Sequence, residues 1–106
     1  MEAYDLHDLL AAHEDNGRLY HEFIRVPALS VGLYRLPATG QDPQSPHQED
    51  EVYYIISGEG IIHVDGEDRP VKTGTTIYVA AHDVHYFHTI TEELTILVFF
   101  APAETG

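Results

Sequence analysis

Alternation of apolar and polar residues is the main pattern of this chain after Arg18. Short segments with a period of two are rich in β-branched and aromatic residues, which is typical of β-strands. They cover residues 18–26, 29–36, 51–57, 61–66, 75–80, 84–90 and 94–100. Glycines and prolines punctuate these segments, namely Pro37, Gly40, Gly58, Gly60, Gly66, Gly74 and Pro102. The pattern predicts an all-β fold, a small sandwich or barrel.

The beginning of the chain follows a different period. Within residues 5–14, Leu6, Leu9, Leu10 and His13 recur at helical spacing, and the sequence "DNG" that follows ends on a residue suited to a positive φ. This pattern predicts one short amphipathic helix. We therefore expect two parts, which are an N-terminal helical segment over residues 1–17 and a single β-barrel domain over residues 18–106.

Composition narrows the choice of partners. The 106 residues include 18 acidic and 5 basic ones, a formal charge of −13 that repels phosphate backbones and anionic lipid surfaces. We therefore expect neither a nucleic-acid nor a membrane partner. The acidic N-terminus and the short apolar run "ILVFFA" favour a cytoplasmic protein. The chain has no cysteine, so any metal must be held by nitrogen and oxygen ligands.

Histidines and carboxylates gather in two separate places, and a site would form only if the fold brought them together. These candidates are His47, Glu49, Asp50, Glu51, His82, His85 and His88. Imidazole and carboxylate ligands suit Fe, Mn, Ni, Cu or Zn, and two histidines with one carboxylate leave coordination positions open. Most histidines in small domains are surface or structural residues. The residues alone therefore leave open the alternative that these histidines bind no metal.

Strand parity sorts some of these side chains. Alternate residues face opposite sides of a sheet, so Glu51, Tyr53 and Ile55 share one face. In the segment "GIIHVDG", His63 falls on the polar face with Asp65, and we do not count it as a ligand.

The spacing around the candidate residues is regular in two stretches. In the first, Gly40 is followed by four residues, then Ser45, Pro46, His47, three residues, Glu51, six residues and Gly58. In the second, Gly74 is followed by five residues, then Ala80, Ala81, His82, two residues, His85, three residues and Thr89.

These stretches resemble the two motifs of the cupin superfamily. The first motif reads Gly, five residues, His-x-His, three or four residues, Glu, six residues, Gly; the second reads Gly, five residues, Pro-x-Gly, two residues, His, three residues, Asn. The resemblance implies a cupin jelly-roll β-barrel with a degenerate first motif. It also implies that His47, Glu51 and His85 bind a divalent metal, with Ser45 standing where the first histidine would be. Since cupins include members without metal, a metal-free pocket stays open as the alternative.

Neighbouring residues have competing interpretations. Gln44 would reach the metal only through its amide oxygen, and its parity favours a loop amide instead. Glu49 would replace Glu51 only if the loop folded back, and His82 and His88 are expected at solvent or an interface. By parity the aromatic residues Tyr53, Tyr78, Tyr86 and Phe87 would line or back the pocket, although aromatic strand residues more often form the core.

The resemblance implies two possible activities. The first is an RmlC-like or dioxygenase-like metalloprotein, a metal-dependent oxygenase or isomerase acting on a small organic molecule. The second is a cupin that binds or senses a small ligand without turnover. Cupins often pair through N-terminal strands, so the apolar face of residues 18–26 implies a homodimer.

Overall fold

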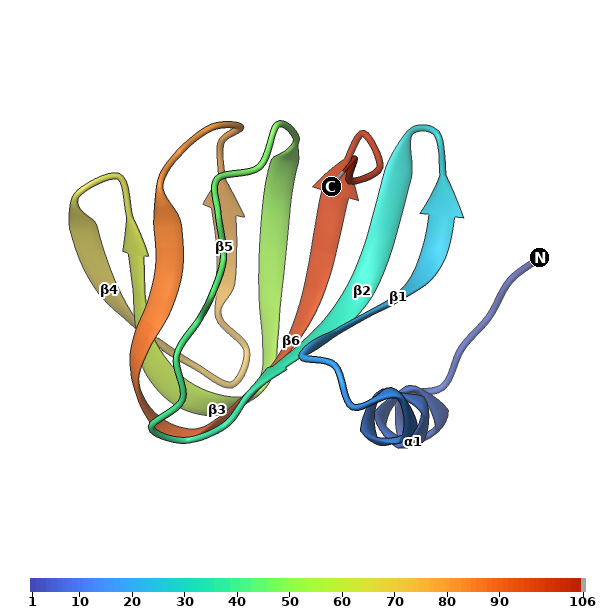
Figure 1. Ribbon diagram of the computed structural model, residues 1–106, viewed down its shortest axis with the longest axis horizontal. Helices are drawn as coiled ribbons and strands as arrows, with labels where there is room; N and C mark the ends of the chain where they lie inside the picture. Colours follow the sequence, from blue (N-terminus) through green and yellow to red (C-terminus); the bar gives the residue numbers. More distant parts are fainter. Residues whose placement is uncertain (106) are drawn as a thin grey trace.

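The computed structural model describes residues 1–105 and contains one helix and one antiparallel sheet (Figure 1). The strands are hydrogen-bonded in the order β1-β2-β6-β3-β4, and β5 pairs with β3. The elements are α1 (Leu6–Asn16), β1 (Tyr20–Val26), β2 (Leu29–Leu36), β3 (Asp50–Val64), β4 (Glu67–Lys72), β5 (Thr76–Val79) and β6 (His85–Ala101). The sheet curls on itself into a barrel, and the predicted all-β fold with an N-terminal helix is confirmed.

Two long strands make the curl. β3 and β6 pair along their whole length, with register shifts between Ile55 and Ile61, and such bulges bend a sheet. The start of β3 also pairs with β5, whereas its end pairs with β4. The sequence pattern predicts two strands in place of each long one, because Gly58 and Gly60 in β3, and a polar stretch in β6, look like turns.

Strand β4 is not predicted by the sequence pattern. Its segment "EDRPVK" has little apolar alternation and contains Pro70. β4 occupies an edge of the sheet, where a proline costs no ladder hydrogen bond on the outer side.

The core lies inside the curl and follows the predicted alternation along β3. Glu51, Tyr53 and Ile55 are each at most 2% exposed, as expected for residues that share the inner face. Around them pack buried residues from β2, β3, β4, β5 and β6, including Leu36, Val71, Val79, Phe87, Leu94 and Ile96, and Tyr20 of β1 packs against this cluster while only partly buried. The candidate carboxylate Glu51 therefore enters the barrel among apolar side chains.

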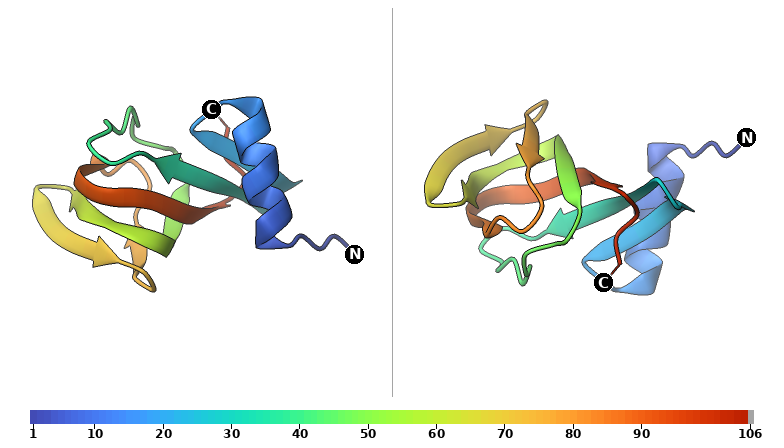
Figure 2. Two further views of the ribbon diagram at one scale, coloured as in Figure 1. Left: turned by 90° about the horizontal axis from the view of Figure 1, so that it is seen from below. Right: turned by 90° about the horizontal axis from the view of Figure 1, so that it is seen from above.

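Helix α1 lies outside the barrel against β1 and β2 (Figure 2). It buries Leu9 and His13 and ends at Gly17, whose φ of 66° is left-handed as predicted. The His13 ring hydrogen-bonds to the Leu19 carbonyl at 2.6 Å. Within residues 1–105, no helix is long and apolar enough to cross a membrane.

Candidate metal centre

The fold brings together the three candidate ligands that the sequence places in separate motifs. His47, Glu51 and His85 each offer a ligand atom, and these atoms all lie within 4.8 Å of one another. Glu51 lies near the start of β3, whereas His85 begins β6 and pairs with Val64 at the far end of β3. The curl of the sheet therefore carries His85 back to Glu51.

His47 reaches the site from the loop that precedes β3. Its carbonyl accepts a hydrogen bond from the His82 amide at 2.7 Å, which ties this loop to the turn before β6. His82 has a left-handed φ of 70° at the position where the family motif has glycine, and its side chain is exposed. His82 therefore shapes the turn, and its side chain stays outside the site as expected.

Each of the two histidines is oriented through its Nδ1 atom. Nδ1 of His47 lies 3.0 Å from Oε2 of Glu104, and Nδ1 of His85 hydrogen-bonds to the Asp83 carbonyl at 2.8 Å. Both Nδ1 atoms thus face acceptors and carry the ring proton, which leaves the Nε2 atoms to face the site.

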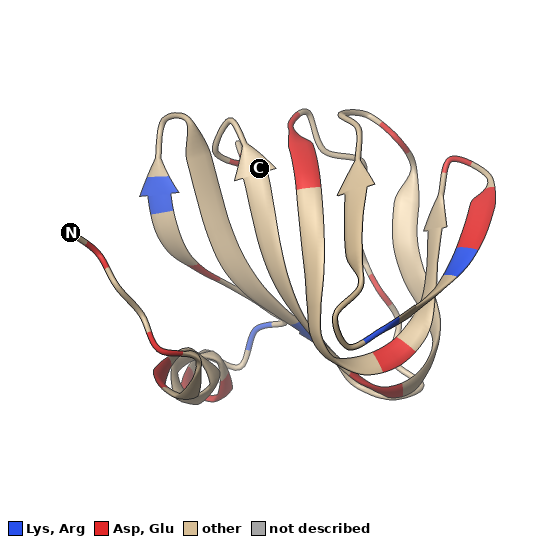
Figure 3. Ribbon diagram, turned by 180° about the vertical axis from the view of Figure 1, so that it is seen from behind, with Lys and Arg blue, Asp and Glu red and all other residues tan. Residues whose placement is uncertain are grey.

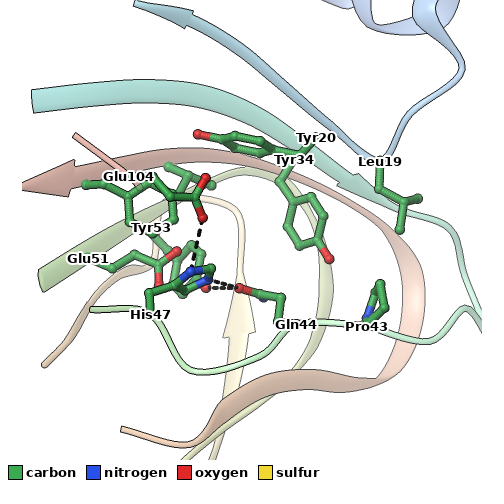
Figure 4. A pocket seen from close by; sticks show the side chains of 11 residues that line it. Leu19, Tyr20, Tyr34, Pro43, Gln44, His47, Glu51, Tyr53 and Glu104 are labelled. Carbon is green, nitrogen blue, oxygen red and sulfur yellow. Dashed lines mark hydrogen bonds and ion pairs between the residues drawn. The ribbon is translucent and has the colours of Figure 1, made fainter. Parts of the chain in front are cut away.

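The Nε2 atoms face oxygen as well. Oε1 of Gln44 faces both atoms, at 3.4 Å from Nε2 of His47 (drawn in Figure 4) and at 3.2 Å from Nε2 of His85. A neutral imidazole that donates from Nδ1 has only a lone pair at Nε2. Two nitrogen lone pairs would then point at an oxygen, so either protons or a cation must lie between them.

The surroundings of both histidines favour positive charge. The hydrogen bond to Glu104 raises the pKa of His47, and the charge of Glu51 adds to the rise, against an opposing effect of burial. Burial alone would lower the pKa of His85, but the Glu51 carboxylate and the Asp83 carbonyl together raise it above its ordinary value.

Glu51 supplies the clearest sign that this cluster fits a cation. Its carboxylate is 2% exposed, and neither oxygen has a hydrogen-bond partner among the described residues. Nε2 of His85 comes within 3.1 Å of Oε1, but this contact is not aligned as a hydrogen bond and is therefore electrostatic. A buried, unpartnered carboxylate is costly unless an ion compensates it. Two imidazoles and this carboxylate are donors suited to a divalent metal.

Gln44 is a loop amide as expected, but its side chain lies beside the candidate ligands, against the parity argument. The parity argument assumes a strand, but no strand includes residues 41–47, where Pro43 and Pro46 interrupt the chain. The amide of Gln44 consequently turns into the site, whereas the Ser45 side chain at the family's first histidine position is exposed. That Gln44 and not Ser45 faces the site depends on the path of the loop, which the sequence does not show.

Two acidic residues of the site also escape the sequence analysis. Glu104 lies beyond the last strand and returns to His47, and Asp42 holds Gln44 through the amide nitrogen at 2.6 Å. Asp42 falls at an unspecified spacer position of the first motif, and Glu104 lies outside both motifs. Glu49, in contrast, is buried away from the cluster, where it accepts a hydrogen bond from Thr105 at 2.8 Å.

The predicted aromatic lining is only partly right. Tyr53 lines the pocket and Phe87 backs it from the core, but Tyr78 is 62% and Tyr86 is 38% exposed. Both lie on the outer face of the sheet, and Tyr86 stacks on His63 with ring centroids 4.8 Å apart.

The two remaining candidate residues lie outside the site. Asp50 begins β3 at the surface and accepts hydrogen bonds from the Tyr78 hydroxyl and the Ala81 amide. His88 lies on the outer face, where it shares the Asp68 carboxylate with His63.

A pocket of about 240 Å³ opens beside the candidate ligands (Figure 4). Its wall is largely apolar and includes Leu19, Tyr20, Tyr34, Pro43, Val98 and Phe100. The Tyr20 hydroxyl is buried and has no hydrogen-bond partner among residues 1–105. The lining within this range contains no lysine or arginine, and acidic residues mark the start of β3 at this end of the barrel (Figure 3).

Comparisons with solved structures agree with the fold. A protein from Thermus thermophilus superposes with a TM-score of 0.76 and 22% identity, covering 97% of this chain and 99% of that one. An RmlC-like cupin from Shewanella frigidimarina gives a TM-score of 0.70 at 19% identity, over 79% and 75% of the two chains. These likenesses concern the fold alone.

Comparisons with sequences identify the family. An uncharacterized protein of Streptomyces coelicolor is 43% identical over 105 residues, which is 99% of this chain and all of that protein. An oxalate-binding protein of Thermotoga maritima is 32% identical over 70% of this chain and 53% of its own length, so the chain spans about half of that relative. The family model described as "Cupin domain" matches residues 32–100. The chain belongs to the cupin family.

Proposed function

We propose that this cupin binds one divalent metal through His47, Glu51 and His85 and acts on a small organic molecule as a metal-dependent oxygenase or isomerase. The observation that carries the proposal is the buried Glu51 carboxylate, which has no hydrogen-bond partner among the described residues and lies beside two histidines whose Nε2 atoms face oxygen. A cation at this point would compensate the carboxylate and both lone pairs together.

The pocket supports a small and largely apolar substrate. A bound metal would polarise a carbonyl group or activate oxygen at its open coordination positions. The aromatic wall would exclude water from that place, and the unpartnered Tyr20 hydroxyl would hydrogen-bond to a polar group of the substrate. Since burial and nearby carboxylates raise the pKa of Tyr20, this hydroxyl keeps its proton and serves as a donor.

A second candidate function is ligand binding without turnover. It is favoured by the relative named oxalate-binding protein, which is 32% identical over 70% of this chain. The described lining offers no lysine or arginine for a dianion, and in the metal-loaded protein His47 would be a neutral ligand, so an anionic ligand would depend on the metal for its positive partner.

Metal analysis of protein purified without added metal tests the proposal. We expect about one equivalent of a divalent ion, which is lost in His47→Ala, Glu51→Ala and His85→Ala. His63→Ala and His88→Ala are matched controls, since both histidines lie on the outer face of the sheet and outside the cluster. If the three cluster variants keep the metal content of the parent, the assignment is wrong.

Screening small molecules against the metal-loaded protein separates the two functions. Compounds that raise the melting temperature only when metal is present bind at the site. Mass spectrometry of such a compound after incubation in air shows whether it is altered. Conversion that disappears in Glu51→Ala supports the enzyme, whereas binding with full recovery of every ligand supports the binding protein.

A further inference from the structure

The position that supplies the first histidine in the resembled motif is occupied here by an exposed serine, and the neighbouring Gln44 points inward instead. On the basis of the proposed metal site, we propose that Oε1 of Gln44 is a fourth protein ligand, and that Asp42 fixes the amide so that its oxygen faces the metal. The chain thereby replaces a histidine ligand with an amide from another position of the loop.

The direction of the amide follows from its hydrogen bonds. Nε2 of Gln44 donates to Oδ2 of Asp42 at 2.6 Å, and the reversed amide would place two oxygens against each other. Asp42 is itself fixed, because its carboxylate accepts hydrogen bonds from the Tyr34 hydroxyl and from the Phe87 amide. The oxygen of the Gln44 amide must therefore face the cluster.

The spacing around Oε1 matches a coordination shell. Ligand atoms about 2.1 Å from a common metal ion lie roughly 3.0 Å apart in octahedral and roughly 3.4 Å apart in tetrahedral geometry. Oε1 lies 3.2 Å from Nε2 of His85 and 3.4 Å from Nε2 of His47, and Nε2 of His85 lies 3.1 Å from Oε1 of Glu51. All three distances lie between the octahedral and the tetrahedral value.

Tyr53 completes the support of this oxygen. Its hydroxyl donates to Oε1 of Gln44 at 2.8 Å, from a side chain that is fully buried. An amide oxygen has two lone pairs, so it can accept from Tyr53 and still ligate a metal. Tyr53 and Asp42 thus act as positioning residues on the two ends of one amide.

The experiment compares Co²⁺ binding by the parent, Gln44→Met, Ser45→Ala and His47→Ala. Methionine keeps the length of the side chain and offers a soft sulfur that suits Co²⁺ poorly. We expect Gln44→Met to weaken Co²⁺ binding by at least about 10-fold, the scale seen even for residues that only support ligands. The visible absorption of bound Co²⁺ should also change, because that spectrum responds to the set of ligands. Ser45→Ala should match the parent.

The outcomes separate this inference from the proposed function. If the parent binds no Co²⁺, the metal site itself fails. If His47→Ala loses binding but folded Gln44→Met keeps both the affinity and the spectrum of the parent, the fourth ligand alone is refuted. If Gln44→Met does not fold, NMR of the unmutated protein decides. Zn²⁺ must then shift the side-chain carboxamide carbon of Gln44, and a shift confined to the rings of His47 and His85 overturns the inference.

Discussion

At the scale of single residues, the orientation of each candidate histidine ligand is set by the group that its Nδ1 atom contacts. His47 and His85 each use Nδ1 on a fixed acceptor, so both rings present the same nitrogen to the cluster. The motif spacing is enough to select these two residues and Glu51, because the barrel brings its two motifs together. Glu104 and Gln44 cannot be selected in this way, since their positions depend on the paths of an irregular loop and a C-terminal segment.

Removing the charge of Glu104 should weaken the candidate site without removing a ligand. In Glu104→Gln, the amide oxygen still accepts a hydrogen bond from His47, but the loss of charge makes the ring a poorer donor to a metal. We expect an affinity about 10-fold lower in a competition assay with a chelating dye. Glu92→Gln is the matched control, because Glu92 is exposed. Equal affinities in the two variants would show that Glu104 has no such role.

The raised pKa values of His47 and His85 give opposite pH dependences to the metal-free and metal-loaded protein. Without metal, the folded state holds these protons more tightly than the unfolded chain. Their stabilising effect is therefore complete below about pH 6.5 and is lost as the pH rises through the raised values. With metal bound, both rings are neutral. As the pH falls, protons begin to displace the ion at a pH above the ordinary histidine pKa, because the pKa values of both rings are raised.

Melting temperatures between about pH 6 and 8 measure this difference. We expect the metal-free protein to lose stability as the pH rises and the metal-loaded protein to gain it. Other groups titrate too, so His85→Gln serves as the reference, and its metal-free slope should be shallower than that of the parent. Slopes of the same sign with and without metal would contradict the prediction.

At the scale of elements, the sequence predicts the strands but divides the two longest. The alternation predicts strand segments within β1, β2, β3, β5 and β6, and it correctly identifies the inward-facing residues at the start of β3. It fails at Gly58, because a glycine in a bulge and a glycine in a turn have the same local signature. Only pairing with a distant strand distinguishes them, and that information is not local.

Gly58 is expected to tolerate no side chain. Its φ is 104°, and a Cβ atom there would lie 2.1 Å from the Glu93 carbonyl oxygen across the β3–β6 pair. Gly66 is a matched control, since its φ is 86° but a Cβ atom added there would meet nothing within 4 Å among the described residues. Chemical denaturation should show a loss of at least about 2 kcal/mol for Gly58→Ala and about 1 kcal/mol for Gly66→Ala. Equal losses would mean that the close approach does not matter.

At the scale of the whole molecule, assembly is the open prediction. β1 is an edge strand that pairs only with β2 among the described residues, and edges of this kind are commonly covered or paired. We expect a homodimer of two-fold symmetry, with the mass of two chains in light scattering at micromolar concentration. A monomer mass across that range would contradict it. The measurement is repeated at high salt as a control. Each chain carries a formal charge of −13, and added ions screen the repulsion between two copies that could otherwise hide a dimer.

The return of Glu104 to His47 has a practical consequence for anyone preparing this protein. Thr105 is also engaged, through its hydrogen bond to Glu49, so additions behind it begin next to the pocket. A polyhistidine purification tag fused there would compete for the same ions and disturb the carboxylate that orients His47. Recombinant versions intended for metal measurements should therefore carry their tag ahead of α1, which lies outside the barrel, or have it cleaved before the metal is measured.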